Sequence, residues 1–195
     1  MKLTAQQEAL FEFVKEWHGD QKRKYSLAPY WTHLYAVAET ASSILKSDGV
    51  IEIALCHDLL EDTPCTRQQL ADQLKTLGYN AFQIKTIIQG VVELTDVFVK
   101  ENFPELNRKE RRKKEAVRLG KTSSMSQSIK YADLIDNTRT IATDDPGFAR
   151  MYLNEIMDIL DHMRNGDIRL LVNCCYTVKT AQLILYPLPE AKKVS

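Results

Sequence analysis

The feature that most constrains this chain is a short apolar segment crowded with ionisable side chains. Residues 54–66 read ALCHDLLEDTPCT and hold His57, Asp58, Glu61 and Asp62 within six positions. The leucines between them indicate that the segment packs into a core. Three carboxylates that approach one another repel, and their burial is costly unless a cation lies among them. The sequence therefore predicts a metal ion, basic side chains, or both at this place.

The spacing of these residues favours a site on one side of a helix. His57 and Glu61 are four residues apart, as are Asp58 and Asp62, so a helix would present both pairs on neighbouring stripes. An imidazole next to a carboxylate suits Mn, Fe, Zn or Co, which makes His57 and Asp58 candidate ligands. Glu61 and Asp62, one turn further on, are candidates for handling protons or a water molecule.

Two ligands do not complete a metal site, so further ligands are expected from elsewhere in the chain. His33 lies in the apolar stretch YWTHLYAVAE, and Asp133 lies in IKYADLIDNT. Asp133, Asn137 and Thr140 follow helical spacing and would share one face of their helix. Apolar neighbours would turn that face toward the core, where it could meet the segment of residues 54–66.

The pattern of apolar residues predicts helices from end to end and no strand of useful length. Thr66 followed by Gln69 resembles a capping box, which marks the start of a helix. The segment at 96–107 reads as a loop, and TDDPG and NGD separate the last helices. We expect an all-α helical bundle around a central metal site, organised as a single domain over residues 1–195 with a frayed tail after about residue 185. The expected helices cover residues near 10–17, 32–45, 49–62, 80–95, 108–121, 126–142, 148–164 and 167–185, and a further helix is expected to begin after Thr66.

Composition limits the classes of function. Lys+Arg and Asp+Glu both number 26, so the formal net charge is zero. A general nucleic-acid binder is usually strongly basic, and no nucleic-acid partner is expected. The four cysteines form neither a CxxC pair nor a disulfide framework and are interpreted as reduced, mostly buried thiols. Neither a signal peptide nor a membrane span is evident, which favours a cytoplasmic protein without a membrane partner. The oligomeric state stays open.

Four blocks of sequence, taken in order, resemble a known family. They are HGDQKRK followed by PYWTH, LCHDLLEDT, VVELTDV and IKYADLIDNTRT. HDLLED matches the HD-x-x-ED signature of HD-domain phosphohydrolases. The whole set resembles the hydrolase domain of RelA/SpoT-type enzymes and the stand-alone small alarmone hydrolases, over roughly residues 10–165. The resemblance implies Mn-dependent hydrolysis of the 3′-pyrophosphate of (p)ppGpp.

The resemblance also implies roles for individual residues. It assigns one divalent metal, preferably Mn²⁺, to His33, His57, Asp58 and Asp133, and water activation to Glu61 and Asp62. It assigns contacts with a small-molecule nucleotide to five residues: Arg23, Lys24, Asn137, Arg139 and Thr140.

This sequence departs from the family pattern at several places. Leu34 stands where a proline is usual, one residue is inserted between Lys24 and Pro29, and Asp136 stands where the bifunctional enzymes carry histidine. No synthetase segment follows, so synthesis of alarmone is not implied. The basic run Arg108–Lys121 is either a solvated helix face or a rim that attracts phosphate.

Other residues and other functions remain open. His18 is expected at the surface or a pocket rim, and His162 in solvent; Tyr131 and Tyr152 either border a base or pack in the core. One alternative function is an HD-type phosphohydrolase acting on ppApp, NADPH or a nucleoside monophosphate. The other is a non-catalytic HD module that binds a nucleotide or nucleic acid.

Overall fold

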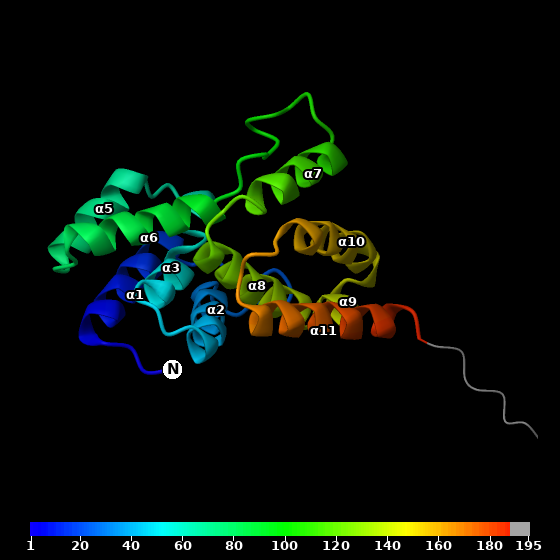
Figure 1. Ribbon diagram of the computed structural model, residues 1–195, viewed down its shortest axis with the longest axis horizontal. Helices are drawn as coiled ribbons and strands as arrows, with labels where there is room; N and C mark the ends of the chain where they lie inside the picture. The colour runs from blue at the N-terminus through cyan, green and yellow to red at the C-terminus, as the bar shows by residue number, and fades with distance from the viewer. Residues whose placement is uncertain (188–195) are drawn as a thin grey trace, which may run out of the picture.

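Two groups of helices build the protein, as the computed structural model of residues 1–187 shows (Figure 1). The first group buries an apolar cluster, called here the N-terminal core, that includes Leu10, Leu34, Leu55 and Ile87. Its helices are α1 (Ala5–His18), α2 (Trp31–Ile44), α3 (Val50–Cys56), α4 (Leu59–Asp62), α5 (Arg67–Thr76) and α6 (Ala81–Leu94).

The second group buries its own apolar cluster, the C-terminal core, which includes Leu119, Leu153, Ile156 and Leu170. Within residues 1–187 the structure has no strand, so the predicted all-α fold class is confirmed. The helices of this group are α7 (Arg108–Leu119), α8 (Ser124–Thr138), α9 (Ile141–Asp144), α10 (Pro146–His162) and α11 (Ile168–Leu185).

Helix α8 connects the two groups. Ile129 and Ala132 pack in the N-terminal core, whereas Tyr131, Leu134 and Ile135 pack in the C-terminal core. Helix α8 contacts α2, α3 and α6 on one side and α11 on the other, and Figure 1 shows it in the middle of the molecule. Its remaining face points to the junction between the two groups, where the candidate site lies.

Local sequence signals set most helix starts. The predicted capping box at Thr66 and Gln69 is confirmed, and Thr4, Asn80 and Asn107 form capping boxes of the same kind. Each such cap satisfies free amides of the first turn and stabilises its helix by about 1 kcal/mol. Helix α5 begins directly after Thr66 as expected, and the observed bounds of α6 and α7 follow the predicted ranges closely.

The predicted continuous helix over residues 49–62 is wrong, because it is interrupted at His57 and Asp58. Nδ1 of His57 lies 2.8 Å from the carbonyl oxygen of Ala54. A regular helix would offer that carbonyl to the amide of Asp58. The side chain of His57 therefore uses a backbone acceptor at the point where α3 ends. At this interruption Asp58 faces His33 on α2, and His57 faces Asp133 on α8.

Three smaller expectations need correction. The predicted helix 126–142 is divided into α8 and α9, with Thr140 between them. On α1 the fully buried stripe includes Phe11, while Phe13 and Trp17 are only half-buried. His18, expected at the surface or a rim, is buried: its ring lies against Tyr30 with 5.0 Å between centroids. The expected frayed tail lies mostly outside the described residues.

Among residues 1–187, every helix is too short or too polar to cross a membrane.

Candidate metal centre and adjoining cleft

Two buried histidines form the base of the candidate metal centre. His33 on α2 is 2% exposed and His57, just after α3, is 1% exposed. Nδ1 of His33 lies 2.7 Å from Oδ2 of Asp136, and Nδ1 of His57 lies 2.8 Å from the carbonyl of Ala54. Since both partners are acceptors, each Nδ1 is assigned the proton. Each Nε2 is then left with a lone pair, which is the arrangement of metal-binding histidines.

Two carboxylates face these Nε2 atoms. Oδ2 of Asp58 lies 3.1 Å from Nε2 of His57 and 3.6 Å from Nε2 of His33. Oδ1 of Asp133 lies 3.2 Å from Nε2 of His33 and 3.7 Å from Nε2 of His57. The ligand atoms of His33, His57 and Asp58 all lie within 4.8 Å of one another. The fold thus brings together the four residues that the sequence nominates as metal ligands.

This centre has the chemistry of a cation site. Nε2 of His57 is buried and makes no hydrogen bond, although buried polar atoms are normally satisfied. Burial alone would lower the pKa of His57, but the negative charge of Asp58 raises it well above its ordinary value. The field that attracts a proton here would also attract a divalent cation. Mixed imidazole and carboxylate donors fit such an ion.

A half-buried lysine balances one of the carboxylates. Nζ of Lys130 lies 2.8 Å from Oδ2 of Asp133, on the side opposite the oxygen that faces the histidines. Burial alone would lower the pKa of Lys130 and raise that of Asp133, but their attraction keeps both charged. Sequence reasoning missed Lys130, although its spacing of three residues from Asp133 on a helix was a usable signal.

Tyr30 is a second residue that sequence reasoning missed. Its hydroxyl donates to Oδ2 of Asp58 at 2.7 Å and so helps to fix the orientation of that carboxylate. It belongs to the PYWTH block, three residues before His33, which was the available signal.

Glu61 and Asp62 lie on the short helix α4, one turn beyond Asp58, and both side chains reach solvent. Oε2 of Glu61 accepts a hydrogen bond of 2.9 Å from the amide of Asp96. Partial loss of water around the carboxylate, reinforced by the charge of Asp96, raises the pKa of Glu61 to about 7. Burial and the charge of Asp58 raise the pKa of Asp62 as well. A carboxyl group with a pKa near 7 can exchange a proton at neutral pH.

A cleft of about 460 Å³ opens beside the metal centre, and His33 and Tyr30 form part of its wall. All five residues predicted to contact substrate line it: Arg23, Lys24, Asn137, Arg139 and Thr140. Tyr152 lines it too, stacked on Phe148 at 5.4 Å between centroids. Tyr131 is instead a packing residue whose hydroxyl donates to the carbonyl of Met163.

The loop between α1 and α2 brings the basic pair to this cleft. The amide of Arg23 donates to the carbonyl of Ala28 at 2.8 Å, and the amide of Tyr30 donates to that of Gln21 at 2.9 Å. The loop closes on itself in this way despite the inserted residue. The guanidinium of Arg23 then lies 2.8 Å from Oδ2 of Asp136, the same oxygen that receives Nδ1 of His33.

Asn137 links the cleft to the metal centre, because its Nδ2 donates to Oδ1 of Asp133 at 2.6 Å.

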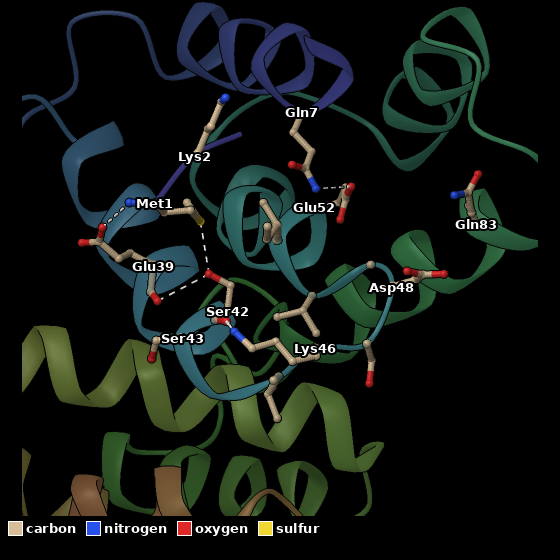
Figure 2. A pocket seen from close by; sticks show the side chains of 15 residues that line it. Met1, Lys2, Gln7, Glu39, Ser42, Ser43, Lys46, Asp48, Glu52 and Gln83 are labelled. Carbon is tan, nitrogen blue, oxygen red and sulfur yellow. Dashed lines mark hydrogen bonds and ion pairs between the residues drawn. The ribbon is translucent and has the colours of Figure 1, made fainter. Parts of the chain in front are cut away.

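A second hollow, of about 630 Å³, lies beside the N-terminus and holds none of the predicted site residues (Figure 2). Several of its polar groups pair with one another: the N-terminal amine pairs with Glu39 at 2.5 Å, and Nε2 of Gln7 donates to Glu52 at 2.9 Å. We therefore place the candidate site at the metal centre and its cleft.

Comparison with known proteins agrees with the motif analysis. No family model matches the chain. It is 28% identical over 131 residues to a guanosine-3′,5′-bis(diphosphate) 3′-pyrophosphohydrolase of Aquifex aeolicus. That match covers 67% of this chain and 17% of the relative. It is 29% identical over 133 residues to the enzyme of that name from Drosophila melanogaster, MESH1, covering 66% of this chain and 65% of the relative. The resemblance to RelA/SpoT-type hydrolases is confirmed.

The solved structures extend the likeness to the fold. One of them, described as a metazoan ortholog of SpoT that hydrolyzes ppGpp, superposes with a TM-score of 0.75 at 21% identity. The match covers 94% of this chain and 99% of that one. At this identity the likeness establishes the shared helical fold. A third relative, a GTP pyrophosphokinase from Brucella ovis, is 41% identical over 64 residues, which is 33% of this chain and 8% of that protein.

Proposed function

We propose that this chain is a metal-dependent hydrolase that removes the 3′-pyrophosphate of (p)ppGpp, releasing GDP or GTP and pyrophosphate. One observation carries the proposal: two histidines and two aspartates cluster together, and one of them, His33, also lines a cleft that contains basic residues. The relatives named as pyrophosphohydrolases support this choice of substrate. The proposal treats residues 1–195 as a single domain, because the site takes residues from both groups of helices.

The four residues of the centre would hold one divalent ion, and we propose Mn²⁺. The unsatisfied Nε2 of His57 and the mixed imidazole and carboxylate donors fit such an ion. When bound, the ion would lower the pKa of a water molecule and offset the charge of phosphoryl oxygens. Asp136 and Ala54 orient the histidines through Nδ1, and Lys130 and Tyr30 orient the aspartates.

Glu61 is proposed as the proton acceptor. Its Oε2 is held by the Asp96 amide, which leaves Oε1 free to take a proton from the attacking water, and its pKa of about 7 suits this task. Asp62 would orient that water. Arg23, Lys24 and Arg139 would bind phosphate groups in the cleft, with Asn137 and Thr140 as polar contacts to the nucleotide.

The proposal is tested by pyrophosphate release from ppGpp, with purified protein, added Mn²⁺ and an EDTA control. We expect release that depends on the metal and is abolished in Asp58→Ala, which should also lose bound metal. Turnover of ppApp, NADPH and deoxynucleoside monophosphates is measured beside it. Absence of ppGpp hydrolysis in protein with bound metal would refute the proposal. Equal or faster turnover of another nucleotide would move the assignment to that substrate.

A further inference from the structure

The basic helix α7 has a role that its composition does not suggest. Three of its charged side chains, Arg112, Glu115 and Arg118, turn toward the rest of the protein and contact residues 93–98, at the end of α6 and just beyond it. Glu115 is only 2% exposed. These residues therefore bind another part of the same chain rather than forming a solvated face.

Glu115 fixes the backbone that follows α6. Its Oε2 accepts hydrogen bonds from the amide of Val97 at 3.2 Å and from that of Phe98 at 3.1 Å. Its Oε1 is held by Nε of Arg118 at 2.6 Å. One oxygen of this buried carboxylate thus receives backbone amides and the other a guanidinium, and together these donors keep the carboxylate in one orientation.

Arg118 extends the same arrangement to the end of α6. Its two terminal nitrogens donate to the carbonyls of Glu93 at 2.9 Å and Thr95 at 3.2 Å. The last carbonyls of a helix carry partial negative charge, so a guanidinium is well placed there. Nearby, Arg112 binds Oδ2 of Asp96 at 2.7 Å. Residues 93–98 are thus held through both their backbone and a side chain.

This segment in turn holds the proposed proton acceptor. The amide of Asp96 donates to Oε2 of Glu61 at 2.9 Å. Within residues 1–187 it is the one hydrogen-bond donor recorded for the Glu61 carboxylate, which sits on a helix of only four residues. The position of Glu61 therefore depends on the position of the Asp96 backbone.

We propose that Glu115 and Arg118 are positioning residues for Glu61, acting through residues 95–98. The inference rests on the proposed function and assigns a part of it to α7. Replacing a whole buried ion pair by apolar residues often changes stability little, because desolvation offsets the attraction. The contacts of this pair are directed at the backbone that orients a catalytic carboxylate. Loss of the pair should therefore slow turnover more than it weakens substrate binding, since neither residue lines the substrate cleft.

The test begins with Glu115→Gln in Mn²⁺-loaded protein. A glutamine side chain has one acceptor oxygen and no charge to hold Arg118. We expect kcat to fall about ten-fold or more, because small displacements of a catalytic group are costly, and KM to change less than two-fold. Hydrogen exchange of the Asp96, Val97 and Phe98 amides should accelerate. Asp161→Asn is the matched control, since Asp161 forms a comparable pair three residues from Arg164 but on the surface.

A double-mutant cycle separates positioning from general weakening of the fold. If Glu115 acts through Glu61, Glu115→Gln should have no further effect on kcat in a Glu61→Gln background. Arg118→Lys, which keeps the charge but loses the fork of donors, should reproduce the fall in kcat if Glu115→Gln does not fold. An equal loss of kcat in both backgrounds would overturn the positioning role.

The outcomes also distinguish this inference from the proposed function. A wild-type protein that releases no pyrophosphate from ppGpp contradicts the proposed function. An active wild type, with unchanged kcat and unchanged exchange at Asp96 in both variants, overturns the positioning role alone.

Discussion

The candidate metal centre and the adjoining cleft lie side by side but are built in different ways. The side chains of His33, His57 and Asp133 are no more than 5% exposed. In the cleft, the side chains of Arg23, Lys24 and Arg139 are 26%, 69% and 55% exposed. The proposed ligands come from helices and the segment between α3 and α4, whereas Arg23 and Lys24 come from a loop. The side chains of the centre are held by hydrogen bonds and ion pairs within the protein, while the cleft has long, exposed side chains that can adjust to a phosphate group.

This difference teaches how the two regions should respond to change. Removing a buried, hydrogen-bonded side chain leaves its partners unpaired, and unpaired polar atoms are costly in the interior. An exposed group loses its own contact and little more. Substitutions at the centre should therefore abolish metal binding or turnover, and substitutions in the cleft should only weaken substrate binding. Groups at the border between the regions show whether this division holds.

Among these border groups, the largest expected effect comes from Glu61, which adjoins the centre in sequence but reaches solvent. Glu61→Ala should retain most of the bound metal and lower kcat by about 10²–10⁴-fold, the usual contribution of a proton-transfer group. Metal content per protomer and steady-state kinetics measure the two properties in one preparation. A fully active variant would contradict the role of Glu61 in water activation, and loss of metal would assign Glu61 to the centre itself.

An intermediate effect is expected at Asp136, which both regions share. Its Oδ2 receives Nδ1 of His33 and the guanidinium of Arg23. Asp136→Asn weakens both contacts, so metal affinity should fall about 10–100-fold, as is usual when the partner of a metal-binding histidine is changed. Titration of the metal-free protein with Mn²⁺ gives the affinity directly. Asp72→Asn, an exposed aspartate on α5, is the control. Unchanged affinity would show that His33 needs no support from Asp136.

The sequence predicted what depends on local spacing. Helical periodicity and capping pairs set most helices, and the HD-x-x-ED block nominated ligands that the fold does bring together. The break between α3 and α4 could not be read from periodicity, because it arises where a side chain binds a backbone carbonyl.

Long-range contacts were the main omission. His33 and Asp136 are 103 residues apart in sequence. The contact of Glu115 with the backbone of residues 97 and 98 likewise depends on how α7 packs. A run of basic residues looks the same whether its charges face solvent or a neighbouring loop. The sequence could therefore name the residues of the centre but not the groups that orient them.

The smallest expected effect tests the cleft itself. Arg23→Gln removes the charge that faces Asp136 and, by proposal, the phosphate groups of the substrate. A charge-assisted hydrogen bond to phosphate contributes about 1.5–3 kcal/mol, and the partial exposure of Arg23 reduces this. We expect KM for ppGpp to rise about ten-fold, with kcat changed less than two-fold. Metal affinity should stay unchanged, because Asp136 still holds His33. If Arg23→Gln weakened Mn²⁺ binding as much as Asp136→Asn, a cleft residue would be needed to hold the metal ligands in place. The division between an adjustable cleft and a fixed centre would then be wrong.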